Sequence, residues 1–120
     1  MRRGVLIVDD HPSFRRFATK LLAAGGFEVV GEAKDGSSAL AAARRLRPDL
    51  VLLDVLLPDM SGFAVAEALA ATSEAPAVVL VSSRTASELG ASLDESPVRG
   101  FVTKGELTAA AVAALVEGAA

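Results

Sequence analysis

Residues 5–12 read Val-Leu-Ile-Val-Asp-Asp-His-Pro, an apolar run that ends abruptly in two acidic residues. A run without polar alternation is typical of a parallel strand that helices cover on both faces. Pro12 favours the first position of a helix, because its fixed φ angle suits that position and its missing N–H is not needed there. The stretch therefore predicts a buried strand, two carboxylates at its end, and then a helix.

Four further apolar, β-branched runs follow along the chain, and each pair leaves room for a helix between them. Strand and helix thus alternate five times, which predicts an α/β fold. With right-handed crossovers, the fold is a five-stranded parallel, doubly wound sheet with five helices in a three-layer sandwich. The four further runs are Val29–Val30, Leu50–Leu53, Val78–Val81 and Phe101–Val102.

Helical spacing of apolar residues fills the segments between these strands. The first helix is expected from Pro12 to the residue before Gly25, with Phe14 and Phe17 on the stripe that faces the core. The other four helices are expected over Ser37–Leu46, Ser61–Ala71, Thr85–Leu93 and Glu106–Glu117.

Length and composition limit the class of protein. The chain has 120 residues, of which 52% are hydrophobic and 22% charged, so we expect one globular domain over residues 1–120. No apolar run approaches the roughly 18 residues that a membrane helix needs, and no export signal precedes the first strand. We therefore expect a soluble cytoplasmic protein without membrane contact.

The residue types that are missing exclude several chemistries. The chain has no cysteine, which excludes disulfides, thiol catalysis and thiolate metal sites. Its net charge of -3 and its lack of Trp and Tyr argue against direct nucleic-acid binding. Oxygen ligands and His11 remain for any metal, so a hard cation is favoured.

Polar residues stand where the predicted strands end. Asp9 and Asp10 follow the first strand, Asp54 the third, Ser82 the fourth and Lys104 the fifth. Ligands collect at the carboxyl ends of strands in such sheets, and ionised carboxylates about 5 Å apart repel by roughly 3 kcal/mol unless a cation joins them. The set predicts a Mg²⁺ site, in which the ammonium and the hydroxyl would bind a phosphoryl group on a carboxylate.

At this point the sequence resembles a known family, the receiver domains of two-component response regulators, over nearly its whole length. The resemblance is closest to receivers of NarL/LuxR-type regulators, and it implies a flavodoxin-like fold and a signalling domain rather than an enzyme with an external substrate. The matching motifs are residues 5–12, Asp54-Val-Leu-Leu-Pro-Asp-Met-Ser-Gly62, Val81-Ser-Ser83 and Gly100-Phe-Val-Thr-Lys104.

The resemblance implies a role for each acidic residue. Asp54 would be the phosphoacceptor that takes a phosphoryl group from the phosphohistidine of a sensor histidine kinase. Asp10 and Asp54 would bind Mg²⁺ directly and Asp9 through a water molecule, while Leu56 would contribute its backbone carbonyl.

The resemblance also implies a switch. Lys104 would pair with Asp54 and then with the phosphoryl oxygens, Ser82 would move toward the phosphoryl group, and Phe101 would fill the space that Ser82 leaves. The surface built from the last two helices and the fifth strand would then change. This surface is the candidate contact for a downstream output domain or protein, including one for transcription regulation, and for a homodimer.

Three positions depart from the family pattern or modify it. Gly105 follows Lys104 where many receivers have proline, so the loop before the last helix is expected to be more mobile. Leu56 and Arg84 stand at positions that in receivers affect how fast the phosphoryl group is lost to water. Because Leu56 has no polar atom to position a water, and Arg84 supplies charge near the phosphoryl group, we expect a long-lived phosphorylated form.

The same residues allow other interpretations. The main alternative function is a receiver-like protein-interaction module that is not phosphorylated; a phosphohydrolase with an aspartyl nucleophile and a nucleotide or flavin binder fit the motifs less well. Taken alone, Asp9 and Asp10 would cap a helix, His11 would be a capping or surface residue, and the arginines from 44 to 47 would form a solvated helix face.

Overall fold

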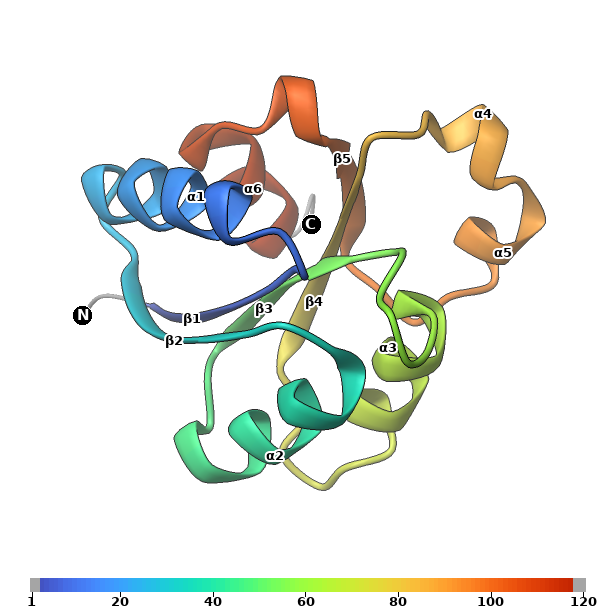
Figure 1. Ribbon diagram of the computed structural model, residues 1–120, viewed down its shortest axis with the longest axis horizontal. Coiled ribbons are helices and arrows are strands. Elements are labelled where there is room, and N and C mark those ends of the chain that lie inside the picture. The colour runs from blue at the N-terminus through green and yellow to red at the C-terminus, as the bar shows by residue number, and fades with distance from the viewer. Residues whose placement is uncertain (1–2, 118–120) are drawn as a thin grey trace.

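The computed structural model describes residues 3–117, which form one parallel sheet with helices on both of its faces (Figure 1). The strand order is β2-β1-β3-β4-β5, and every neighbouring pair is parallel. The predicted five-stranded, doubly wound sheet is therefore confirmed. The strands are β1 (Gly4–Val8), β2 (Glu28–Ala33), β3 (Leu50–Asp54), β4 (Ala77–Ser82) and β5 (Gly100–Thr103).

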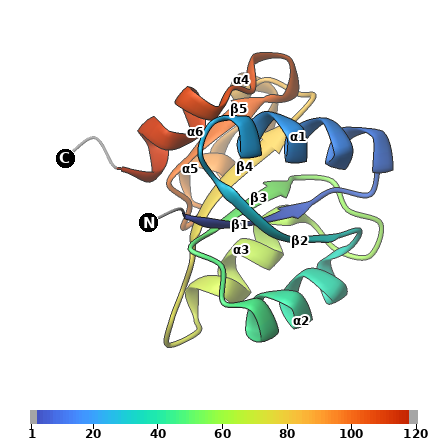
Figure 2. The ribbon, with the colours of Figure 1, turned by 90° about the vertical axis from the view of Figure 1, so that its left-hand side faces the viewer.

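Two layers of helices enclose the sheet. Figures 1 and 2 show α1 and α6 over one face of the sheet and α2 and α3 over the other. None of the helices between residues 3 and 117 is long and apolar enough to cross a membrane. The helices are α1 (Pro12–Ala24), α2 (Gly36–Leu46), α3 (Gly62–Ala70), α4 (Ala86–Leu89), α5 (Ala91–Asp94) and α6 (Ala109–Val116), with a 3₁₀ helix at Lys104–Glu106.

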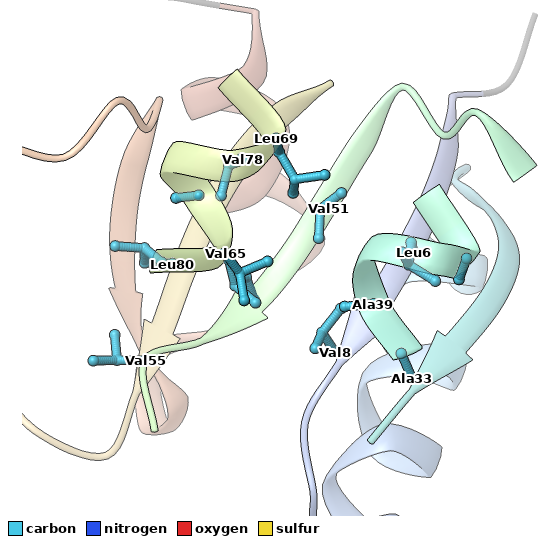
Figure 3. Close-up of a cluster of buried hydrophobic side chains, with 13 residues drawn as sticks. Leu6, Val8, Ala33, Ala39, Val51, Val55, Val65, Leu69, Val78 and Leu80 are labelled. Carbon is cyan, nitrogen blue, oxygen red and sulfur yellow. The ribbon is translucent and has the colours of Figure 1, made fainter. Parts of the chain in front are cut away.

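The strand residues point alternately into two separate cores. Leu6, Val51 and Leu80 pack against α2 and α3, as Figure 3 shows for their side of the sheet. Their neighbours Ile7 and Leu52 pack against α1 and α6 on the opposite face. Because both faces are buried, the strands have apolar runs rather than alternation, and each fully buried leucine contributes about 1.5–3 kcal/mol to stability.

The prediction of a single helix over Thr85–Leu93 is wrong. The segment forms two one-turn helices, α4 and α5, that meet at Gly90, whose φ of 65° and ψ of -147° lie outside the helical range. Neither short helix has a buried residue. The described residues therefore contain six α-helices rather than the five predicted.

The start predicted for the last helix is also wrong. The helix α6 begins at Ala109 rather than Glu106, because the hydroxyl of the preceding Thr108 accepts a hydrogen bond from Ala111 N at 3.0 Å and caps the first turn. Glu106 lies in the 3₁₀ helix, where its carboxylate accepts from the Thr103 hydroxyl at 2.8 Å. The start of α6 is therefore set by the Thr108 side chain and not, as predicted, by the acidic residue Glu106.

The prediction that Phe17 lies in the core is wrong as well. Its side chain is 51% exposed, whereas Ala18 and Leu22 are fully buried. These two buried residues are four apart and define the stripe of α1 that faces the sheet, so Phe17 lies about 100° to one side of it. Phe14 is half-buried and packs against the core, and its ring centroid lies 6.2 Å from that of Phe17.

Candidate functional site

The carboxyl ends of four neighbouring strands meet at one edge of the sheet. Asp9 directly follows β1, Asp54 ends β3, Ser82 ends β4 and Lys104 follows β5. The registers of β1 with β3, β3 with β4 and β4 with β5 are continuous, so Asp9 lies level with Asp54, and Ser82 and Lys104 lie one and two residues further toward the carboxyl edge. A pocket of about 220 Å³ opens there, and Asp10, Asp54, Ser82 and Lys104 line it.

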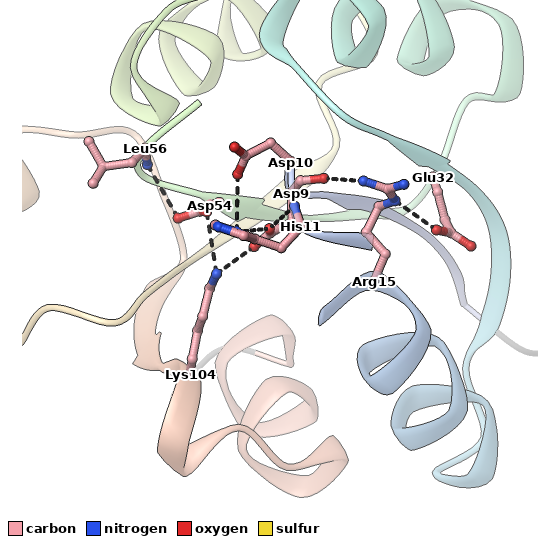
Figure 4. Close-up of polar contacts among 8 residues, drawn as sticks. All are labelled: Asp9, Asp10, His11, Arg15, Glu32, Asp54, Leu56 and Lys104. Carbon is pink, nitrogen blue, oxygen red and sulfur yellow. Dashed lines mark hydrogen bonds and ion pairs between the residues drawn. The ribbon is translucent and has the colours of Figure 1, made fainter. Parts of the chain in front are cut away.

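Three carboxylates and an imidazole gather in this pocket (Figure 4). One ligand atom from each of Asp9, Asp10, His11 and Asp54 lies within 4.8 Å of the others. Asp9 is fully buried and Asp54 is 4% exposed, whereas the side chain of Asp10 is 39% exposed at the pocket opening. The convergence predicted from the strand ends is therefore present in the structure.

Lys104 bridges the two buried carboxylates. Its Nζ lies 2.7 Å from Asp9 Oδ2 and 3.5 Å from Asp54 Oδ2. The contact with Asp9 is the closer of these two ion pairs. Burial alone would lower the pKa of Lys104, but the two carboxylates outweigh burial and raise it above its ordinary value. The ammonium is therefore charged at neutral pH.

Asp9 is held from several sides. Its Oδ1 accepts a hydrogen bond from His11 N at 2.8 Å, and Lys104 faces its other oxygen. Burial raises the pKa of Asp9, but the contacts with Lys104 and His11 outweigh burial and lower it. Arg15 Nη1 donates to the backbone oxygen of Asp9 at 2.7 Å, and Arg15 Nε donates to Glu32 at 2.9 Å. No sequence signal distinguishes Arg15 from its neighbour Arg16.

His11 lies at the surface, as predicted, but its side chain does not cap α1. Instead, its Nδ1 lies 3.0 Å from Asp9 Oδ1 and 3.1 Å from Asp10 Oδ1. The imidazole thus covers one side of the acidic pair.

Asp54 is the carboxylate that the fold disfavours most in its charged form. Burial, followed by the negative charge of Asp9, raises its pKa from 3.8 to about 6. Lys104 and a hydrogen bond of 3.2 Å from Leu56 N to Asp54 Oδ1 offset only part of this. A cation in the pocket would therefore favour the ionised form of Asp54.

This pKa predicts how stability depends on pH without metal. Between pH 4 and 6 the folded chain binds more protons at Asp54 than the unfolded chain does, so stability falls as pH rises through this window. A shift of about two units amounts to about 3 kcal/mol. Urea unfolding at intervals across this window should show this slope in the wild type and lose it in Asp54→Asn. An equal slope in both proteins would contradict the assignment.

The loop between β3 and α3 is fixed by backbone packing and by Asp59. Gly62 N donates to Val55 O at 2.7 Å, and a Cβ at Gly62 would collide with the backbone oxygen of Asp54. The Asp59 carboxylate accepts from Gly36 N at 2.8 Å and Ser37 N at 2.9 Å, which ties the loop to the start of α2. These hydrogen bonds lower the pKa of Asp59. This contact could not be predicted from the sequence, because no local pattern links Asp59 to residues so far away along the chain.

The remaining predicted residues lie at different distances from the carboxylates. Ser82 is buried in the pocket wall, and its Oγ accepts from Arg84 N at 3.0 Å. The Leu56 side chain is 57% exposed beside the pocket. Arg84 is exposed and Phe101 is half-buried, and neither lines the pocket.

A larger cavity of about 340 Å³ lies elsewhere, between α2 and α3. Its walls are mostly apolar, and Arg47 and Glu74 at its edge form an exposed ion pair of 3.8 Å. The arginines at 44, 45 and 47 are exposed, as the solvated-face interpretation predicted. This cavity has no carboxylate cluster, so the sheet edge is the candidate functional site.

The fold and the site define a class: a doubly wound parallel α/β domain with an acidic pocket and a lysine at the carboxyl edge of its sheet. Within this class, residues 5–116 match the family model described as the response regulator receiver domain. The chain belongs to this family, and the resemblance noted in the sequence is confirmed.

Relatives and solved structures agree. Over 82 residues the chain is 50% identical to the DNA-binding response regulator MtrA of Mycolicibacterium smegmatis, a match that covers 67% of this chain and 35% of MtrA. The signal receiver domain of NarL from Mycobacterium tuberculosis superposes with a TM-score of 0.89 at 31% identity over 98% of both chains. A LuxR-family response regulator from an Aurantimonas species has a TM-score of 0.85 at 27% identity, over 98% of this chain and 88% of that one. The match thus spans about a third of the length of MtrA.

Proposed function

We propose that this receiver domain accepts a phosphoryl group on Asp54 from the phosphohistidine of a sensor histidine kinase. An Asp54 carboxylate oxygen attacks the phosphorus, the bond from phosphorus to the histidine nitrogen breaks, and an acyl phosphate forms. The observation that carries the proposal is the placement of Asp54, a buried carboxylate that opens into the pocket between the acidic pair and the Lys104 ammonium. The ammonium is placed to bind the phosphoryl oxygens as Asp54 loses its own charge.

The donor set at this site fits Mg²⁺. It offers carboxylate oxygens from three aspartates, and only two of these carboxylates pair with the single Lys104 ammonium, which leaves excess negative charge. Asp10 and Asp54, which line the pocket, would bind the ion directly, with the backbone carbonyl of Leu56. Asp9, whose Oδ1 and Oδ2 already face His11 and Lys104, would bind it through water. Bound Mg²⁺ would neutralise the carboxylates and attract the phosphoryl oxygens.

Asp10→Asn should lower Mg²⁺ affinity about 10- to 100-fold, because it removes the exposed carboxylate at the pocket opening. Without metal its melting temperature should equal or exceed that of the wild type, since one repulsive charge is removed. Thermal unfolding across a Mg²⁺ titration measures both effects. Asp94→Asn, at an exposed position on α5, is the matched control. Unchanged affinity in Asp10→Asn, or a lower metal-free melting temperature, would contradict the metal assignment.

The switch in this proposal passes from the pocket to the face that includes β5. Ser82 would turn toward the phosphoryl group, and Phe101 would respond by repacking. Phe101, Leu89 of α4 and Leu93 of α5 are half-buried and pack against the same core, and α4 and α5 bury no residue of their own. Such a loosely packed segment can shift at low cost. This face, with α6, is the proposed contact for an output domain or protein and for a homodimer.

The phosphorylated form should be long-lived. Leu56, two residues after the acceptor, has an exposed apolar side chain with no atom to position a water, and Arg84 is anchored beside Ser82 through its backbone N–H. Decay of the acyl phosphate, followed by intact mass after the phosphodonor is removed, should take minutes or longer. Leu56→Gln supplies polar atoms and should shorten the lifetime. Decay of the wild type within seconds would contradict this prediction.

The experiment that tests the proposed function is incubation with acetyl phosphate, a small phosphodonor, with Mg²⁺ or with EDTA. Incorporation that needs Mg²⁺ is the expected result. No incorporation in a folded protein that binds Mg²⁺ would instead favour the alternative, a receiver-like interaction module.

That the receiver unit extends over all 120 residues stays a prediction.

A further inference from the structure

Lys104 faces an aromatic ring as well as two carboxylates. Its Nζ lies 4.5 Å from the centroid of the Phe14 ring, which α1 brings to the pocket from the far end of the sequence. Phe14 is half-buried, and the Phe17 ring lies against it with an interplanar angle of 46°. The ammonium is thus enclosed by Asp9, Asp54 and an aromatic face.

The geometry is that of a cation–π contact. An ammonium within about 6 Å of a ring centroid is attracted by the negative face of the ring, and the attraction grows as water is excluded. The side chain of Lys104 is only 21% exposed, so the contact is largely desolvated. The ring also presents an apolar wall, which strengthens the attraction of Lys104 to the carboxylates.

The residue after Lys104 offers no side chain to hold the lysine in place. Gly105 follows it, and a Cβ there would meet no heavy atom within 4 Å, so no side chain packs on that side. The lysine side chain has four flexible bonds, and its ammonium is a point charge with no preferred direction. The contacts at the end of the side chain therefore fix where the ammonium lies.

We propose that Phe14 is a positioning residue for Lys104: the face of its ring holds the ammonium at Asp9 and Asp54, so the rate of Asp54 phosphorylation depends on the electrostatics of that ring. The inference deepens the proposed function and rests on it. The helix α1 would then contribute a side chain, Phe14, that positions a residue of the site.

A double-mutant cycle tests the dependence on Lys104. Phe14→Leu keeps an apolar side chain and removes the ring; it should slow phosphorylation by acetyl phosphate in Mg²⁺ by about three- to tenfold. In the Lys104→Met background the same substitution should have no such effect. Phe14→Tyr, which retains the ring, should restore most of the rate. Phe17→Leu is the matched control, since the described contacts of Phe17 include the Phe14 ring but not Lys104.

Fluorination of the Phe14 ring separates electrostatics from packing. Mono-, di- and trifluorophenylalanine at position 14 keep the shape of the ring nearly constant and weaken the negative face stepwise. The logarithm of the phosphorylation rate should fall with each added fluorine. A merely structural ring would give equal rates across the series, which would overturn the proposal, as would an equal effect of Phe14→Leu with and without Lys104.

Two readouts without metal keep this inference distinct from the proposed function. The ε-methylene protons of Lys104 should show a ring-current shift in NMR spectra that Phe14→Leu abolishes. Urea unfolding of the wild type, Phe14→Leu, Lys104→Met and the double variant should show that Phe14→Leu lowers the unfolding free energy more when Lys104 is present. If the wild type accepts no phosphoryl group, the proposed function fails while these readouts still decide whether the ring holds the ammonium; no coupling in either would overturn the inference.

Discussion

Asp54→Asn is expected to gain no phosphoryl group from acetyl phosphate in Mg²⁺, while the wild type gains one. The amide oxygen of asparagine is a far weaker nucleophile than the carboxylate and cannot form the acyl phosphate. The variant is nearly isosteric, so the fold should remain. Because the carboxylate is buried and repelled by Asp9, its removal should raise the metal-free unfolding free energy at pH 7 by about 1–3 kcal/mol. Lys104 keeps its closer partner, Asp9.

Intact mass spectrometry measures the first effect and urea unfolding the second. Asp94→Asn, which makes the same chemical change at an exposed site on α5, should match the wild type in both. If Asp54→Asn still gains a phosphoryl group, a side chain other than Asp54 is the nucleophile. If its metal-free unfolding free energy falls instead, the charge of Asp54 does not destabilise the fold, contrary to what its burial and the nearby Asp9 indicate.

Lys104→Met has the second large effect, because it leaves the buried carboxylates of Asp9 and Asp54 without their ammonium. Breaking a buried ion pair from one side costs about 3–5 kcal/mol, and we expect a loss of that order at pH 7 without metal. Phosphorylation should slow by about 100-fold, the effect of removing one preorganised charge from a transition state. Urea unfolding and phosphorylation kinetics measure the two effects.

The stability loss of Lys104→Met should also respond to charge. At pH 5, below the pKa of about 6 for Asp54, that carboxyl is largely protonated, and the difference from the wild type should shrink. Added Mg²⁺ should shrink it as well. Lys20→Met, at an exposed position on α1, is the matched control and should have little effect. An equal loss at pH 5 and pH 7 would mean that the charge of Asp54 contributes little to the stabilising role of Lys104.

Much of the fold could be predicted because the central strands are buried on both faces. The runs at Val5, Leu50 and Val78 stand out as apolar segments, and their strands begin within one residue of those positions. The edge strand β2 was predicted only at Val29–Val30, although it extends over Glu28–Ala33. An edge strand is partly exposed, so its polar residues hide its length from a search for apolar runs.

Local backbone geometry and the direction of helix faces explain the errors. Gly90 visibly interrupts the helical spacing of residues 85–93, but the sequence does not show that it adopts a positive φ and divides the segment into two helices. Likewise, the apolar stripe of α1 is wide enough to include Phe17, and only packing against the sheet selects Ala18 and Leu22 for burial. These features depend on tertiary contacts that a single sequence does not reveal.

The site likewise contains residues whose meeting could be predicted from the sequence and residues whose contacts could not. Asp9, Asp54, Ser82 and Lys104 could be predicted to meet, because the ends of parallel strands share one edge of the sheet. The contacts of Arg15, Asp59 and Phe14 could not, because each reaches across from another element: to the Asp9 carbonyl, to the start of α2 and to Lys104. Such contacts depend on side-chain reach rather than on position along a strand.

Borohydride reduction tests most directly whether Asp54 becomes the acyl phosphate. The wild type is incubated with Mg²⁺ and acetyl phosphate and then reduced, which converts a phosphorylated aspartate to homoserine, and the peptides are mapped by mass spectrometry. Homoserine at position 54 alone, and none when Mg²⁺ is withheld, is the predicted result. Homoserine at Asp9 or Asp10, or at no aspartate in a protein that has gained a phosphoryl group, would contradict it.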